Sequence, residues 1–203
     1  MSEMRQETGD HDVIVIGGAL SGAAAAFLLK RQHTDLRVLV VEKSPEFKRR
    51  VGEATTEVSS YFLTRVLGLA NFLACTQISK NGLRFWFYRE GEGSLGDCSE
   101  LGGRQLSTIP AYLIDRSELD EEVLRRAVAA GVELMRPAQV LSVSLNEGEM
   151  QEVVVRAEGV EKKLRARWVV DASGVKAELA RANGWLKANT EHPTLAVWSR
   201  WRG

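Results

Sequence analysis

Residues 13–42 read VIVIGGALSGAAAAFLLKRQHTDLRVLVVE: a short apolar run, a glycine-rich turn, a stretch of small residues and a second apolar run that ends in an acid. Unbroken apolar runs of this length are typical of parallel strands covered on both faces of a sheet. Gly17, Gly18 and Gly22 supply the tight turn and the close approach of helix to strand that side chains would obstruct. The stretch therefore predicts a βαβ unit that holds a dinucleotide.

The helix of this unit would direct its free N–H groups and the positive end of its dipole at a pyrophosphate. Glu42 stands where a carboxylate usually accepts hydrogen bonds from ribose hydroxyls, and its charge disfavours a 2′-phosphate and hence NADP. One position departs from G-x-G-x-x-G, because Ala19 replaces the second glycine. The alternative, an ordinary loop between strand and helix, is disfavoured because strand, glycines, helix, second strand and acid all fall at suitable spacing.

The composition is that of a globular protein without a dominant charge. Of 203 residues, 44% are hydrophobic, and 27 basic residues balance 27 acidic ones. This balance gives no reason to expect binding to nucleic acid or to an anionic membrane, and no apolar run approaches the length of a membrane span. We expect a soluble, cytoplasmic protein. A metal site is not expected, because the two cysteines and three histidines are scattered.

The chain divides into three parts. Residues 1–11 are expected to be a polar, mobile tail, residues 12–188 one dinucleotide-binding domain, and residues 189–203 the start of a truncated substrate domain. Trp198 and Trp201 in the last part are expected to pack in a second sheet.

Between the βαβ unit and residue 108 the signals are mixed. Residues 48–50 form a cationic cluster, either a solvated charge run or a group that faces a phosphate. A helix is predicted over residues 57–67, with Gly68 as its end. Residues 82–88 predict a strand with aromatic side chains on both faces, which we expect to be covered on both sides. Residues 89–108 are predicted to be a disordered loop or a lid.

The predicted helix over residues 57–67 has its apolar stripe formed by Val58, Tyr61, Phe62 and Val66. After residue 108, the patterns predict a strand at 109–114, a helix from Ser117 as N-cap to Gly131, and a third parallel strand at 132–135.

Further strands are predicted at 140–145, 152–157 and 160–166, an antiparallel meander inserted in the dinucleotide fold. A separate buried strand at 168–170 would end in the small-residue turn 171–174, which should face the same crevice as the glycine turn because ligands gather at the carboxyl ends of parallel strands. A short helix at 175–183 would follow.

Several motifs occur in the order of a known family. GGALSG, the acid at Glu42, VGEATTE, SKNGLRFWF, IDR and WVVDASG together resemble flavin-dependent halogenases of the tryptophan-halogenase type. More broadly, the chain resembles single-domain flavin monooxygenases and geranylgeranyl-reductase-like enzymes. The resemblance implies an α/β, FAD-binding fold of the glutathione-reductase-like kind, with FAD as the cofactor.

The resemblance places the pyrophosphate of FAD on the glycine turn, its adenosine ribose on Glu42, and the segment 171–174 along the cofactor. The residues that we assign to the cofactor are Gly17, Gly18, Ala19, Ser21, Gly22, Glu42, Lys43, Arg50, Ala54, Thr55, Arg116, Val140, Asp171 and Gly174.

In halogenases of this type, reduced flavin and O₂ form a flavin hydroperoxide that oxidises halide, and a lysine steers the oxidant to an organic, often aromatic, substrate. By motif, Lys80 corresponds to that lysine, with Glu53 on the flavin-side loop as the second catalytic candidate. The alternative for Lys80 is a solvated lysine before a turn. The resemblance further implies a small-molecule substrate and a separate flavin reductase as partner.

Two departures leave other functions open. Glu57 stands where the loop motif normally has a proline, and W-x-W-x-I-P is absent. We therefore expect the chain to be the N-terminal portion of a longer enzyme. The alternatives are a flavin monooxygenase or reductase without halide chemistry, and a non-catalytic FAD-binding fragment.

Overall fold

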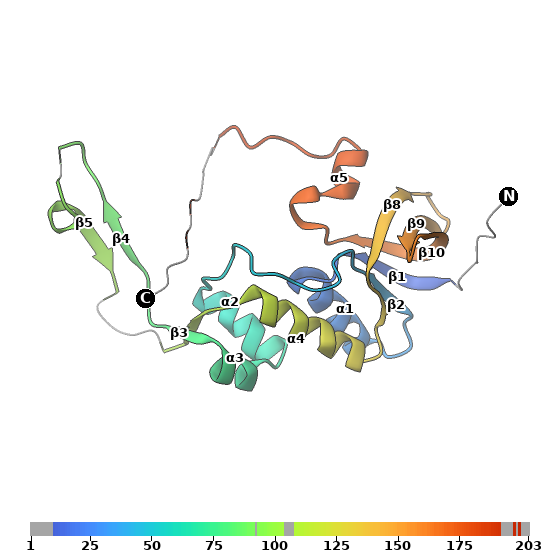
Figure 1. The fold of residues 1–203 in the computed structure, drawn as a ribbon, viewed down its shortest axis with the longest axis horizontal. Helices are drawn as coiled ribbons and strands as arrows, with labels where there is room; N and C mark the ends of the chain where they lie inside the picture. Colours follow the sequence, from blue (N-terminus) through green and yellow to red (C-terminus); the bar gives the residue numbers. More distant parts are fainter. Residues whose placement is uncertain (1–9, 92, 104–107, 192–196, 198, 200–203) are drawn as a thin grey trace. The chain divides into compact units, whose positions relative to one another are not determined.

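The structure is a computed structural model that describes residues 10–91, 93–103, 108–191, 197 and 199. The chain forms two compact units (Figure 1). The first consists of Met1–Val51 and Ser117–Gly203, and the second of Gly52–Arg116.

The first unit is built on a six-stranded sheet with the order β7-β2-β1-β10-β9-β8. Its strands are β1 (His11–Ile16), β2 (Val38–Val41), β7 (Glu133–Met135), β8 (Ala138–Ser144), β9 (Gln151–Ala157) and β10 (Val160–Asp171). Strands β7, β2, β1 and β10 run parallel, whereas β8, β9 and the first half of β10 pair antiparallel, over the segment for which the sequence predicts a meander. The predicted α/β fold is thus confirmed.

Strand β10 belongs to both parts of the sheet. It pairs antiparallel with β9 over Val160–Ala166 and parallel with β1 from Ala166 to Asp171. The prediction of two strands, at 160–166 and 168–170, is therefore wrong, since they form one continuous strand. Trp168 is 68% exposed, so this stretch is also not fully buried. Periodicity misses the continuity because β10 changes partner, and hence its buried pattern, part-way along.

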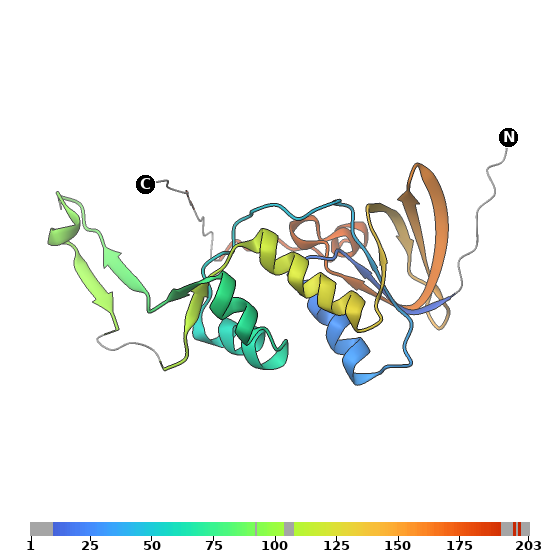
Figure 2. The same cartoon turned by 60° about the horizontal axis from the view of Figure 1, so that its bottom comes forward.

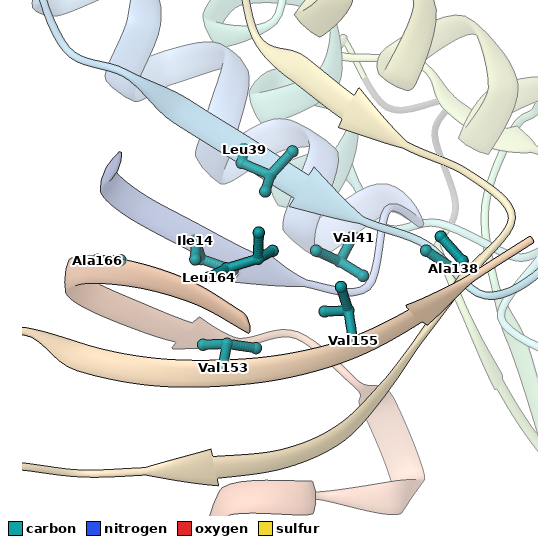
Figure 3. Close-up of a cluster of buried hydrophobic side chains, with 9 residues drawn as sticks. Ile14, Leu39, Val41, Ala138, Val153, Val155, Leu164 and Ala166 are labelled. Atoms are coloured by element: carbon teal, nitrogen blue, oxygen red, sulfur yellow. The ribbon is translucent and has the colours of Figure 1, made fainter. Parts of the chain in front are cut away.

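The core of the first unit lies between the parallel strands and the meander (Figure 3). Ile14, Leu39 and Val41 of β1 and β2 pack against meander side chains that include Val153 and Leu164. Each fully buried side chain of this size contributes about 1.5–3 kcal/mol. The apolar runs at residues 13–16 of β1 and 38–41 of β2 are therefore buried on both faces of the sheet, as expected.

Two helices flank the parallel strands. Helix α1 (Leu20–Gln32) buries Gly22, Ala23, Ala24 and Ala26, so the small residues that allow a close approach of helix to strand are its buried residues. Helix α4 (Arg116–Ala129) buries Leu119, Val123, Leu124 and Ala127. Both lie on the same side of the parallel strands (Figure 2), because each leads to the next strand in the same direction with the usual right-handed crossover.

Several boundaries differ from the prediction. His11 is the first residue of β1 and is buried, so it does not belong to a polar tail. Ser117 lies inside α4 and is not its N-cap. The helix predicted at 175–183 is a 3₁₀ turn (Gly174–Lys176) followed by α5 (Glu178–Ala182), because Ala177 adopts a left-handed conformation between them. Trp198 and Trp201 lie outside the described residues.

The second unit contains α2 (Glu57–Tyr61), a π-helical turn (Phe62–Val66), α3 (Ala70–Thr76) and two pairs of antiparallel strands. Strand β3 (Ile78–Lys80) pairs with β6 (Ala111–Leu113), and β4 (Arg84–Phe87) pairs with β5 (Ser99–Gly102). None of the described helices in either unit is long and apolar enough to cross a membrane.

The apolar stripe predicted for residues 57–67 is wrong. Val58 is 82% exposed, whereas Ser60, Leu63 and Leu67 are the buried residues of this segment. The two sets are equally periodic, and a buried hydrogen bond between Ser60 and Thr55 accompanies the second set. The apolar stripe in the sequence could not show which of the two sets would be buried, because that depends on the polar contact with Thr55.

The aromatic strand also differs from the prediction. Phe85, Trp86 and Phe87 of β4 are all exposed, so the strand is not covered on both sides. Its partner β5, together with a 3₁₀ turn at Leu95–Asp97, lies within residues 89–108, the segment predicted to be a disordered loop or a lid. A two-stranded ribbon leaves both faces open, which accounts for the exposure.

Candidate cofactor site

The glycine turn follows β1 and lies against the turn that follows β10. Gly17 has a φ of +98°, and a Cβ atom on it would lie 2.5 Å from the carbonyl oxygen of Ala172. A Cβ on Gly22 would lie 1.9 Å from the oxygen of Gly17. The structure therefore brings the glycine turn and segment 171–174 together, as the sequence predicts, and both positions require glycine.

Glu42 links the end of β2 to the glycine turn. Its Oε2 accepts a hydrogen bond from the amide of Gly18 at 2.7 Å, and its Oε1 accepts one from the amide of Ser44 at 2.8 Å. The residue is 5% exposed. A carboxylate has about four acceptor positions, so two remain for a ligand such as a ribose.

The residues at this end of the sheet fit a dinucleotide. Helix α1 begins after Ala19, and the first amides of a helix, here around Ser21, have no acceptor within the helix and attract anions. The two acceptor positions that remain on the Glu42 carboxylate suit the hydroxyls of a ribose. The close backbone packing at Gly17 and Gly22 leaves no room for a side chain at these two positions.

Asp171 holds the second turn in shape. Its Oδ1 accepts from the amide of Ser173 at 3.0 Å and its Oδ2 from the amide of Leu179 at 2.8 Å. Partial burial raises the pKa of Asp171, but the hydrogen bonds from Ser173 and Leu179 outweigh it, so the pKa lies below its ordinary value. The neighbouring Gly174 has a φ of +69°. Asp171 is thus an ionised anchor for the start of α5.

The other predicted cofactor residues of the first unit are more dispersed. Arg50 lies over the ring of Phe47 and 3.6 Å from the buried carboxylate of Asp120. Lys43 is exposed. Val140 lines a groove of about 840 Å³ between β8 and α5. Contact of these three residues with the cofactor stays a prediction.

In the second unit the structure brings Lys80 and the predicted flavin-side loop together. Lys80 Nζ donates to the carbonyl oxygen of Thr55 at 2.8 Å. The hydroxyl of Thr55 donates to the oxygen of Tyr112 and accepts from its amide, and the amide of Ile114 donates to the oxygen of Glu53. Lys80 is therefore half-buried and has a partner, unlike a freely solvated lysine.

Two further positions complete this segment. Ala54 forms an isolated bridge with Leu113, and Arg116 lies beside Gly52, with Nη1 3.0 Å from the position that a Cβ there would take. Sequence reasoning missed Ser60 and Tyr112, which fix Thr55. No local signal identifies them, because their roles depend on neighbours distant in the chain.

Comparison with known proteins decides the family. The family model described as an FAD binding domain matches residues 10–197. The chain belongs to this FAD-binding domain family. The match confirms FAD as the cofactor, and the resemblance to flavin-dependent halogenases is confirmed by the proteins to which this FAD-binding domain is similar.

The flavin-dependent brominase Bmp2 is 29% identical, with a TM-score of 0.71 over 86% of this chain and 41% of that one. The tetracycline 7-halogenase of Kitasatospora aureofaciens is 26% identical over 86% of this chain and 33% of its own length. Digeranylgeranylglycerophospholipid reductase 2 of Methanothermobacter thermautotrophicus is 27% identical over 86% and 42%. The FAD-binding domain thus spans less than half the length of these proteins.

Proposed function

We propose that the protein is a flavin-dependent oxidoreductase of the halogenase kind, which uses reduced FAD and O₂ to oxidise halide for transfer to a small organic, aromatic substrate. The observation that carries the proposal is the hydrogen bond from Lys80 to Thr55, because it fixes a lysine on the loop that the resemblance assigns to the flavin. Bound FAD would supply the activation of oxygen, which the side chains of this chain cannot perform.

The remaining roles fall to residues of the chain. Glu42 and the glycine turn hold the adenosine and pyrophosphate parts of the cofactor. Thr55 is fixed by Tyr112 and Ser60, so Lys80 is held at a defined position on β3. An ammonium group in this position can donate a hydrogen bond to an oxidised halogen species and keep it away from water. Glu53 stays a catalytic candidate on the same loop.

Replacement of Lys80 tests the proposal. In the full-length protein, supplied with reduced FAD, halide and an electron-rich aromatic compound, Lys80→Ala should abolish halogenated product while FAD binding and the release of hydrogen peroxide persist. The matched control is Lys30→Ala, since Lys30 Nζ also donates to backbone oxygens, those of Thr34 and Leu36, both at 2.7 Å. Halogenation by Lys80→Ala at the wild-type rate would contradict the proposal.

A second candidate is a reductase or monooxygenase without halide chemistry, favoured by the similarity to the archaeal reductase. The two candidates differ in their dependence on halide and in their electron source. A halogenase of this kind takes reduced flavin from a separate reductase, so the protein alone should not oxidise NADPH at an enzymatic rate. Rapid NADPH oxidation by the purified protein would favour the second candidate.

A further inference from the structure

Arg136 lies between β7 and β8 and is fixed by three hydrogen bonds. Its Nη1 and Nη2 donate to the two carboxylate oxygens of Glu121 on α4, at 2.8 and 2.7 Å. Its Nε donates to the carbonyl oxygen of Ser44 at 2.6 Å. The side chain is 11% exposed. The guanidinium group of this largely buried arginine is hydrogen-bonded both to Glu121 and to Ser44, so the side chain is held in one conformation.

The contact with Ser44 connects Arg136 to the cofactor site. The same residue that gives its carbonyl oxygen to Arg136 gives its amide to Glu42 Oε1. Glu42 in turn accepts from the amide of Gly18 in the glycine turn. A continuous series of hydrogen bonds therefore runs from α4 through Arg136, Ser44 and Glu42 to Gly18.

Packing fixes the same segment further along. The guanidinium of Arg136 lies 4.4 Å from the centre of the Phe47 ring, and the amide of Phe47 donates to Glu121 Oε1 at 2.9 Å. Phe47 is itself buried. The backbone after β2 is thus held at Ser44 and at Phe47 by the same ion pair.

The charges favour this arrangement. The hydrogen bonds to Glu121 raise the pKa of Arg136, burial opposes this, and the charges of Glu121, Glu42 and Glu46 raise it further. Arg136 is therefore a permanent cation near a buried carboxylate. Such a cation attracts the carboxylates around it and so favours the contact of Arg136 with Ser44, next to Glu42.

We propose that Arg136 is a positioning residue for FAD: it holds Ser44 so that the Glu42 carboxylate stays fixed between two backbone amides, with its remaining acceptor positions open to the ribose. This inference rests on FAD binding alone and does not depend on halide chemistry. It concerns a residue that the sequence motifs do not single out, because neither its neighbours in the chain nor its spacing from the glycine turn identifies it.

The test is a double-mutant cycle on FAD affinity in the full-length protein. Arg136→Met keeps the length of the side chain but removes the charged guanidinium group. It should weaken FAD binding roughly tenfold, the effect of losing one charge-assisted hydrogen bond. If Arg136 acts through Glu42, the same substitution in a Glu42→Gln background should weaken binding less than about twofold. A tenfold loss in both backgrounds would overturn the proposal.

Two further variants separate a positioning role from the general effect of losing an arginine. Arg125→Met removes an arginine with the same two-pronged contact, to Glu122 on α4, and should leave FAD affinity unchanged. Arg136→Lys keeps the charge without the fork, so it should bind FAD as weakly as Arg136→Met. Wild-type affinity in Arg136→Lys would show that the hydrogen-bond geometry is not needed and would overturn the proposal.

If Arg136→Met does not fold, Glu121→Gln carries the test, since it loosens Arg136 without removing it. Thermal unfolding of the FAD-free protein reports whether each variant folds. A folded Glu121→Gln protein should bind FAD about threefold more weakly, the effect expected for weakening one side of an ion pair. Unchanged affinity in that folded variant would count against a positioning role.

Discussion

In each unit one buried polar side chain holds a loop. Glu42 holds the glycine turn in the first unit, and Thr55 holds the predicted flavin-side loop in the second. The two are equally buried, at 5% and 6% exposure, and both accept hydrogen bonds from backbone amides. They differ in what remains. The Glu42 carboxylate has acceptor positions to spare, whereas the Thr55 hydroxyl donates its only proton to the carbonyl oxygen of Tyr112 and also contacts the amide of Tyr112 and the hydroxyl of Ser60.

This difference suggests separate roles: Glu42 is suited to binding a ligand, whereas Thr55 is suited to supporting its own loop. Glu42 can hold the glycine turn and a ribose at the same time, so its loss should be felt mainly in the affinity for FAD. Thr55 uses its side chain for support and offers only its carbonyl oxygen, which Lys80 takes. Its loss should be felt mainly in the stability of the second unit.

The largest effect is expected at the glycine turn, where the backbone approach allows no side chain. Gly17→Ala should lower the free energy of unfolding by at least about 3 kcal/mol and abolish FAD binding. Gly148→Ala is the matched control, because Gly148 also has a positive φ but a Cβ there would meet nothing within 4 Å. It should cost about 1 kcal/mol. Equal losses in denaturant unfolding would show that φ strain alone matters.

Removal of the Glu42 carboxylate comes next. Glu42→Ala should weaken FAD binding by about 1–3 kcal/mol, because the ribose and the Gly18 amide both lose an acceptor. A flavin fluorescence titration measures this change. Glu152→Ala, which removes a surface partner of Lys163 on the meander, should leave the affinity unchanged. Similar losses in both variants would show that the effect is not specific to the Glu42 carboxylate.

The second unit gives a smaller effect, on stability. Thr55→Val should lower the free energy of unfolding by about 1–2 kcal/mol, since it leaves the buried amide of Tyr112 without the hydroxyl acceptor. Thr56→Val is the adjacent control, because that hydroxyl is exposed and contacts Ser59; a change within about 0.5 kcal/mol is expected. If Thr55→Val lowered the free energy of FAD binding by more than the free energy of unfolding, Thr55 would act in cofactor binding, as Glu42 is expected to.

The smallest effect concerns pH. The pKa of Asp171 is lower in the folded protein than its ordinary value of 3.8, so the unfolded chain binds more protons between the two pKa values and stability rises with pH there. The contribution is complete well above pH 3.8 and is lost as the pH falls through the folded pKa. The advantage of wild type over Asp171→Asn in urea unfolding is expected to be less than about 1 kcal/mol, because this carboxylate is only partly buried. It should shrink on acidification. If the advantage of wild type grew on acidification, the pKa shift of Asp171 would have the opposite sign.

The first unit could be predicted well because its signals are local. Apolar runs, small residues and a terminal acid fall within thirty residues, and each reports a constraint on its own backbone. The glycines of the turn are required by contacts that only glycine permits. The family motifs carried the prediction of FAD, and the family match confirms it.

The parts that sequence could not predict depend on partners far along the chain. Ser60 becomes the buried face of its helix through Thr55, and Arg136 reaches Ser44 across 92 residues. The aromatic residues of β4 read as a covered strand, yet the two-stranded ribbon leaves them exposed. Patterns in the sequence show that a residue is apolar or charged, but they do not show which residues far along the chain it will contact.

The continuous strand β10 has a consequence for how the cofactor site is assembled. His11, at the start of β1, pairs with Ala166, 155 residues later, so the glycine turn can gain its second wall only when β10 has been synthesised. Such distant pairing slows folding. A slip of one residue between β1 and β10 would also turn Asp171 to the opposite face of the sheet. The register of β10 against β1 therefore controls when, and whether, the glycine turn closes.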